Sequence, residues 1–145
     1  MIRKSMTEWQ GDGQSGSGSL STESGALREQ PYSFKTRFQD GEDGKTVTNP
    51  EELLGAAHAA CFAMTMAFIL SQAGHPPKRL KVTAAVDISK DGTGFSITSI
   101  ALDLEAQAEG LPVELFHVLT QAAKVNCPVS KALSATPISL TARLI

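Results

Sequence analysis

The stretch Asn-Pro-Glu-Glu-Leu-Leu-Gly-Ala-Ala-His-Ala-Ala-Cys-Phe, residues 49–62, carries the clearest structural signal in the chain. Asn49 can cap a helix, and Pro50 suits the first helical position, where its missing N–H is not needed. Glu52 stands three residues after Asn49, so its carboxylate can return to the cap in a capping box. None of residues 53–77 carries a formal charge. The pattern therefore predicts a long apolar helix that begins at Pro50.

A membrane span is the first alternative for this helix, because its apolar part approaches the ~20 residues that cross a bilayer. Its many alanines make it weakly hydrophobic, however, and no Lys or Arg directly flanks its N-terminal end. We interpret it as a buried central helix and predict no membrane contact. A helix that is apolar on all sides must be covered on all sides. A chain of 145 residues with few large side chains needs a partner for this, so we predict a homodimer in which a second copy covers the helix.

The segments around this helix alternate between strand-like and helix-like patterns. Period-two alternation predicts strands within residues 19–24, 32–38, 80–88, 96–105 and 138–144, and places Arg37 on the polar face of its segment. Further helices are predicted over residues 112–126 and 128–133, and turns or polar loops over residues 11–18, 39–45 and 90–94. The length suits one globular domain. We therefore predict a single α+β domain that spans residues 1–145.

Composition argues against nucleic-acid binding. The formal net charge is −2, from 13 basic and 15 acidic residues spread along the chain, so no basic stripe for nucleic acid and no polybasic membrane anchor is present. One Trp, one Tyr and six Phe do not make an aromatic platform for stacked bases. The first nine residues show no apolar leader, which predicts a cytoplasmic protein.

Two cysteines, Cys61 and Cys127, are the main indication of function. In a reducing cytosol a cysteine pair is more often inert, metal-bound or catalytic than permanently bridged. The three histidines form no metal-binding spacing with either thiol, so neither a metal nor another cofactor is predicted. A redox site built on paired thiols is one reading. A binding protein for hydrophobic small molecules with inert cysteines, and a redox sensor without turnover, remain alternatives.

Four segments together resemble the OsmC/Ohr family of osmotically inducible and organic hydroperoxide resistance proteins, and the OsmC branch most. These segments are Ser-Thr-Glu-Ser-Gly (21–25), Thr-Arg-Phe (36–38), the block of residues 49–62, and Cys-Pro-Val-Ser (127–130). The resemblance implies an intertwined homodimer with two long central helices wrapped by antiparallel β-sheets. It also implies a thiol peroxidase that reduces organic hydroperoxides to alcohols and is recycled by a dithiol, carried by a lipoylated protein.

The resemblance assigns roles to four residues. Cys61 is implied to be the peroxidatic thiol, Cys127 the resolving thiol, and Arg37 and Glu51 the polar partners of a site that lies at the subunit interface. Glu51 and Cys61 are ten residues apart, which is about 15 Å along an ideal helix, so they cannot touch within one helix. Either Arg37 bridges this distance, or the thiolate belongs to the other subunit.

A lowered thiol pKa alone cannot make Cys61 a fast peroxidase, and Arg37 is the candidate for the additional stabilisation that is needed. Lowering a thiol pKa from about 8.5 to ~5.5 raises the thiolate fraction at pH 7 roughly 30-fold. A Brønsted slope of ~0.45 removes about 20-fold of that gain, because the thiolate becomes less nucleophilic. A fast peroxidase must therefore also stabilise the charge on the departing alkoxide, which a guanidinium can do.

The two thiols are ranked differently by local physics and by the resemblance. Cys127 directly precedes the helix predicted from Pro128, where exposed amides would stabilise a thiolate. Cys61 lies in mid-helix and lacks this advantage. The N-cap position therefore favours Cys127 as the nucleophile, whereas the resemblance implies Cys61. We follow the resemblance. His58, one turn before Cys61, could tune that thiol, but packing is the role we expect.

Overall fold

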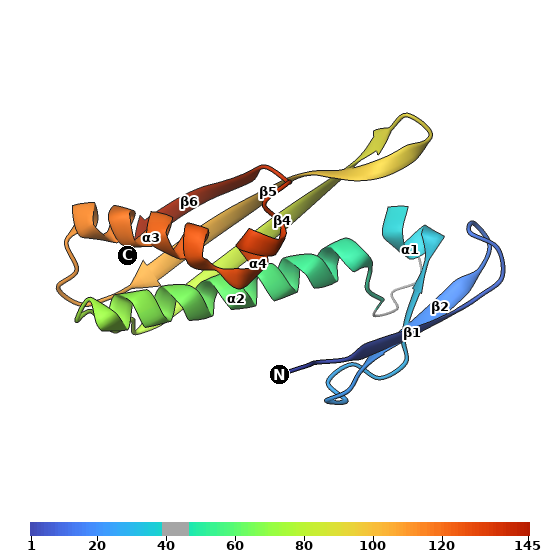
Figure 1. Cartoon of the computed structure of the whole chain (residues 1–145), viewed down its shortest axis with the longest axis horizontal. Coiled ribbons are helices and arrows are strands. Elements are labelled where there is room, and N and C mark those ends of the chain that lie inside the picture. The colour runs from blue at the N-terminus through green and yellow to red at the C-terminus, as the bar shows by residue number, and fades with distance from the viewer. Residues whose placement is uncertain (39–46) are drawn as a thin grey trace. The chain divides into compact units, whose positions relative to one another are not determined.

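The computed structural model describes residues 1–38 and 47–145. It divides into two compact units, Met1–Leu53 and Leu54–Ile145. Figure 1 shows the elements of both units along the chain. The prediction of a single domain stays a proposal.

The first unit contains an antiparallel sheet in the order β1-β2-β3, formed by β1 (Ser5–Gln10), β2 (Ser17–Thr22) and β3 (Gln30–Ser33). The predicted glycine-rich turn joins β1 to β2, although Gly18 belongs to β2 itself. A Cβ at Gly18 would lie 2.6 Å from the ring of its strand partner Tyr32, so only glycine fits at this position of β2. The sheet is further tied by a 2.7 Å hydrogen bond between the hydroxyls of Thr7 and Tyr32.

The prediction of a strand over residues 32–38 was wrong for most of its length, because β3 ends at Ser33 and Phe34–Phe38 form helix α1. Ser33 and Thr36 explain the change. The Ser33 hydroxyl accepts from the Thr36 amide at 3.2 Å, and the Thr36 hydroxyl accepts from the Ser33 amide at 2.8 Å, which is a reciprocal cap. The rings of Phe34 and Phe38 then meet one turn apart, at 4.8 Å. The polar loop predicted over residues 39–45 lies outside the described residues.

Helix α2 (Pro50–Gln72) begins where the sequence predicts. The Asn49 side chain accepts from the Glu52 amide at 2.8 Å, which confirms the cap. The full capping box does not form, because the Glu52 carboxylate accepts from the Thr48 hydroxyl at 2.9 Å instead. At the other end Gly74 takes a φ of +84°, and the His75 amide donates to the Leu70 carbonyl, which closes the helix in a Schellman motif.

The second unit contains a sheet in the order β4-β5-β6. β4 (Arg79–Asp91) and β5 (Gly94–Gln107) form the predicted antiparallel hairpin, but β6 (Ile138–Leu144) runs parallel to β5. The expectation of purely antiparallel sheets was therefore wrong here. The cause is the connection between β5 and β6, which contains helices α3 (Val113–Asn126) and α4 (Pro128–Ala132) and is long enough for a parallel crossover.

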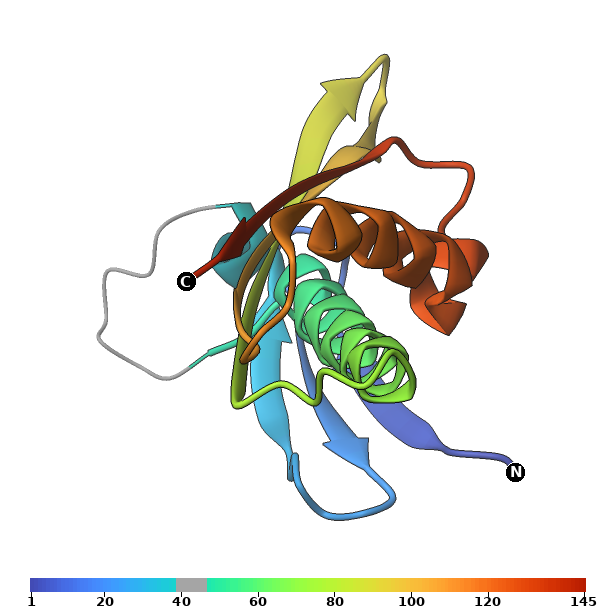
Figure 2. The ribbon, with the colours of Figure 1, turned by 90° about the vertical axis from the view of Figure 1, so that its left-hand side faces the viewer.

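The core of the second unit lies between this sheet and its helices. Figure 2 shows α2 and α3 side by side against the sheet. The core is formed by fully buried apolar side chains from α2, β5 and α3, including Phe62, Met66, Leu70, Ile100, Leu104 and Phe116. On β5 every second residue from Ile100 to Ala106 is buried, as expected for one face of a strand. The sheet therefore fixes one side of α2, the helix that carries Cys61.

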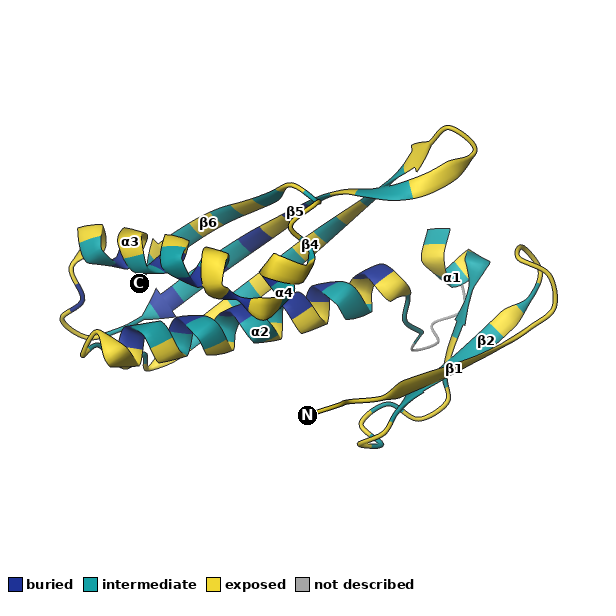
Figure 3. Cartoon of the chain, in the orientation of Figure 1, coloured by how far each residue is buried: buried dark blue, intermediate teal, exposed yellow. Residues whose placement is uncertain are grey.

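Part of the other side of α2 is exposed in the portion of the chain that the structure describes. Met64 and Phe68 expose 63% and 66% of their surface, and Figure 3 shows exposed residues along this helix. By length and composition α2 could cross a membrane, and only 28% of its most apolar window is buried. The described residues of one chain thus leave part of this helix open. Cover from a second copy remains a proposal.

A close approach of α2 to the sheet at Gly55 gives a stability prediction. A Cβ at Gly55 would lie 3.0 Å from the Ala84 carbonyl oxygen and 3.5 Å from the Val86 side chain. Gly55→Val should therefore lower the free energy of unfolding by about 1–3 kcal/mol through overpacking, despite the better helix propensity of valine. Urea unfolding measures this. Gly13→Val, where a Cβ would meet nothing within 4 Å, is the matched control; equal losses at both positions would contradict a steric cause.

Candidate functional site

The structure brings the two cysteines together. Cys61 lies on α2 and is partly buried, whereas Cys127 lies between α3 and α4 and is fully buried. Both are free thiols, Cys61 packs against the buried cluster that contains Cys127, and each thiol shifts the pKa of the other. A disulfide between them would join α2 to the turn between α3 and α4. Residues far apart in the sequence thus form a pair that can be oxidised.

The position of Cys127 follows from local rules. The Cys127 amide still donates to the Ala123 carbonyl at 2.9 Å, so this residue ends α3. Pro128 cannot donate a backbone hydrogen bond but suits the first position of a new helix. Cys127 is therefore the N-cap of α4, as predicted from the sequence.

The two thiols differ in acidity. Burial alone would raise the pKa of Cys127, but the amide and hydroxyl of Ser130, together with the Cys61 thiol and the Val129 amide, outweigh it and lower that pKa. The neutral Cys127 thiol forms no cap hydrogen bond, so these donors act on the thiolate. Burial raises the pKa of Cys61, and the neighbouring Cys127 adds to this. Within this unit Cys127 is therefore the stronger acid, as the N-cap argument predicts.

A second pair of polar residues adjoins the thiols. His58 of α2 is fully buried, and its Nε2 lies 2.8 Å from the Ser130 hydroxyl of α4. The His58 Nδ1 has no hydrogen-bond partner among the described residues. From the sequence we predict only a packing role for His58 and no role for Ser130. The available signal was their spacing, since each stands three residues from a cysteine.

The buried His58 gives a pH prediction. Burial lowers its pKa in the folded protein below the ordinary value of 6.5, so the unfolded chain takes up this proton first as the pH falls. The stability contributed by neutral His58 is complete above pH 6.5 and declines below it, by at most about 1.4 kcal/mol per pH unit. Urea unfolding at pH 7.5 and at about pH 5.5 should show a smaller decline for His58→Gln than for the wild type. Equal declines would show that His58 does not resist protonation.

Arg37 and Glu51 form an ion pair within the first unit. The Arg37 guanidinium donates to both carboxylate oxygens of Glu51, at 2.6 Å from Nη2 and 3.1 Å from Nε. Glu51 is buried, whereas 37% of the Arg37 side chain is exposed. The guanidinium also lies over the Phe38 ring, 5.1 Å from its centroid. Glu51 thus orients Arg37 and leaves part of the guanidinium open. The catalytic roles of both residues stay predictions.

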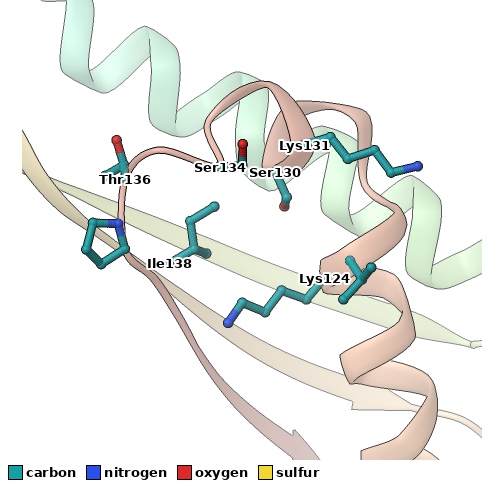
Figure 4. A pocket seen from close by; sticks show the side chains of 8 residues that line it. Lys124, Ser130, Lys131, Ser134, Thr136 and Ile138 are labelled. Carbon is teal, nitrogen blue, oxygen red and sulfur yellow. The ribbon is translucent and has the colours of Figure 1, made fainter.

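A pocket of about 400 Å³ lies beside Ser130. Figure 4 shows its lining from α3, α4 and the segment that leads into β6, with Lys124, Lys131, Ser134, Thr136 and Ile138 around Ser130. Neither cysteine lines it. Among the described residues, no three His, Cys, Asp or Glu side chains gather as metal ligands would.

Known proteins are similar to this chain in sequence. The sequence profile described as OsmC-like protein matches residues 41–142. The chain is 48% identical to Peroxiredoxin OsmC of Escherichia coli strain K12 over 133 residues, covering 92% of this chain and 90% of that protein. It is 30% identical to Organic hydroperoxide resistance protein-like 2 of Staphylococcus epidermidis over 102 residues, covering 69% of this chain and 70% of that protein.

Solved structures share the fold. An OsmC-like protein of unknown function from Vibrio cholerae superposes with a TM-score of 0.77 at 13% identity, covering 99% of both chains. An organic hydroperoxide resistance protein from Elizabethkingia anophelis gives a TM-score of 0.74 at 23% identity, covering 100% of this chain and 99% of that one. The profile match, the identity over nine-tenths of the chain and the paired thiols lead to one conclusion: the chain belongs to the OsmC-like family.

Proposed function

We propose that this chain is a cysteine-based peroxidase that reduces organic hydroperoxides to alcohols in defence against oxidative stress. The observation that carries the proposal is the contact between the free thiols of Cys61 and Cys127, because two thiols in contact can form and release a disulfide without a large movement. The relatives support it, since they are named a peroxiredoxin and organic hydroperoxide resistance proteins.

The reaction has three steps. The Cys61 thiolate attacks the outer oxygen of the hydroperoxide, the O–O bond breaks, and the alkoxide takes a proton to leave as an alcohol. Cys61 becomes a sulfenic acid, and the Cys127 thiolate attacks its sulfur, which forms a disulfide and releases hydroxide. A dithiol then reduces the disulfide through a mixed disulfide and is itself oxidised to a cyclic disulfide.

Access and acidity divide the two roles between the thiols. Cys127 is fully buried, so a bulky hydroperoxide cannot reach it, whereas Cys61 is partly open. The lower pKa of Cys127 suits the second step, in which a thiolate must attack a neighbouring sulfenic acid. The higher pKa of Cys61 means that the first step needs an added cation. Arg37, oriented by Glu51, is our candidate for that cation.

The proposed enzyme has two protein partners, a second copy of itself and a source of reducing dithiol. We propose a cytoplasmic homodimer in which a second copy covers the exposed side of α2, including Met64 and Phe68. We also propose a lipoylated protein as the source of the reducing dithiol. Whether Arg37 serves Cys61 of its own chain or of the partner is answered by the mixing experiment described in the Discussion.

Substrate preference tests the proposal. Cys61 packs against an apolar cluster, so the alkyl part of a hydroperoxide should gain roughly 0.8 kcal/mol per buried methylene. Cumene hydroperoxide should therefore exceed hydrogen peroxide in kcat/KM by about tenfold or more. Steady-state turnover with dihydrolipoamide measures both. Multiple turnovers separate an enzyme from a binding protein or a sensor, and an equal or reversed preference would contradict selection by apolar burial.

A further inference from the structure

A buried polar connection runs from His58 to the Cys127 sulfur. His58 Nε2 lies 2.8 Å from the Ser130 hydroxyl, and both side chains are buried. The Ser130 hydroxyl in turn stabilises the thiolate of Cys127 and so lowers its pKa, and Cys127 is the residue that caps α4 three positions earlier. The connection links α2, which carries Cys61, to the turn that carries Cys127. It uses two residues to which the reaction steps above assign no role.

The number of protons available on Ser130 and His58 decides which group donates in each hydrogen bond of this connection. The Ser130 hydroxyl has one proton, and when it donates that proton to the Cys127 sulfur its oxygen must accept from another group. His58 supplies the donor if its neutral ring carries the proton on Nε2. Nδ1 is then a bare acceptor, which agrees with its lack of a partner among the described residues. The opposite tautomer would bury an unpaired N–H at Nδ1, which costs more free energy than a buried nitrogen acceptor without a partner.

We propose that His58 is a positioning residue that, through the Ser130 hydroxyl, holds Cys127 ready to attack oxidised Cys61. The inference rests on the proposed peroxidase function and adds a residue pair to its second step. In that step the Cys127 thiolate forms the S–S bond, the S–O bond of the Cys61 sulfenic acid breaks, and the released hydroxide is neutralised by a solvent proton. His58 exchanges no proton in the step, because it only fixes the direction of the Ser130 hydroxyl.

Few titratable groups surround Cys127 in the described chain. Cys61 faces it from α2, and His58 reaches it only through Ser130. The nearest charged residues of α3 and α4 along the chain, Lys124 and Lys131, line the pocket beside Ser130. The sheet contributes apolar side chains to the cluster that contains Cys127. A change in the pH dependence of Cys127 after mutation of His58 would therefore report on the connection itself.

Single-turnover kinetics test the proposal with four variants. His58→Met is similar in size but has no donor, His58→Gln keeps a side-chain N–H, Ser130→Ala removes the hydroxyl, and His58→Met/Ser130→Ala removes both. Each reduced protein is mixed with one equivalent of cumene hydroperoxide. Peroxide loss and disulfide formation are followed separately by acid quenching and mass spectrometry between pH 5 and pH 9.

We expect disulfide formation at pH 7 to slow about tenfold relative to peroxide loss in His58→Met and in Ser130→Ala, as for loss of one hydrogen bond to a charged group. Its pH midpoint should rise by about one unit. His58→Gln should restore most of the rate, and the double variant should be no slower than Ser130→Ala, because His58 acts only through Ser130. An unchanged midpoint in His58→Met, or a further loss in the double variant, would overturn the proposal.

A second measurement does not depend on peroxidase activity. In a Cys61→Ala background, the ultraviolet absorbance of the thiolate reports the ionisation of Cys127 alone. The Cys127 pKa should rise by about one unit when His58→Met or Ser130→Ala is added, and His58→Gln should reverse most of the rise. No rise would refute the connection. If the pKa rises but the wild type consumes no hydroperoxide, the proposed function fails while the connection stands.

Discussion

Replacing Cys61 with serine should abolish peroxide consumption, with a loss in kcat/KM of about a thousandfold or more, as for removal of a catalytic nucleophile. The remaining thiol, Cys127, is fully buried and cannot take over the attack on a bulky hydroperoxide. Turnover of cumene hydroperoxide with dihydrolipoamide measures the loss. A sulfenic acid found on Cys127 of the Cys61→Ser variant would reverse our assignment of the two thiols.

Cys127→Ser is the matched control, because it removes the other thiol and leaves Cys61 in place. This variant should consume about one equivalent of peroxide, since the first step needs only Cys61. The resulting sulfenic acid should be trapped by dimedone, and excess peroxide should oxidise it further because no thiol resolves it. In the wild type both thiols should disappear together as a Cys61–Cys127 disulfide. A sulfenic acid on neither cysteine would favour the hydrophobic binding protein.

Removing the Arg37 side chain should have the next largest effect. Arg37→Ala should lower kcat/KM by about 10²–10³-fold, as for loss of one preorganised group that stabilises transition-state charge. The guanidinium of Arg37 is preorganised, because its bidentate hydrogen bonds to Glu51 hold one edge in place. Arg37→Lys keeps the charge but loses this geometry, so it should recover only part of the activity. Wild-type activity in Arg37→Ala would remove Arg37 from the site.

Mixing two inactive variants shows which chain supplies Arg37. If the site is shared between subunits, Arg37→Ala and Cys61→Ser proteins should regain activity after their subunits exchange, because a mixed dimer contains one intact site. No recovery would place both residues in the same chain. Sedimentation at micromolar concentration gives the oligomeric state of the same samples, and a fully active monomer would contradict the proposed dimer.

Features that depend on neighbouring residues could be predicted from the sequence. The start of α2 was predicted because Asn49, Pro50 and the charge-free run after them act within one helix. The β4–β5 hairpin and the cap at Cys127 have the same local character. Helix α1 was missed even though its cause is local. The alternation of residues 32–38 favours a strand, but the reciprocal cap between Ser33 and Thr36 ends the strand at Ser33.

The sequence by itself therefore determined where α2 begins, that the fold combines helices with strands, and that two thiols are available for redox chemistry. Only the tertiary structure decided that β6 lies parallel to β5, that Cys61 contacts Cys127, and that His58 meets Ser130 across 72 residues. The physical reason is that caps, turns and periodicity act over a few residues. Contacts between distant segments depend instead on how the apolar faces of α2, α3 and the sheet pack against one another, which no local pattern records.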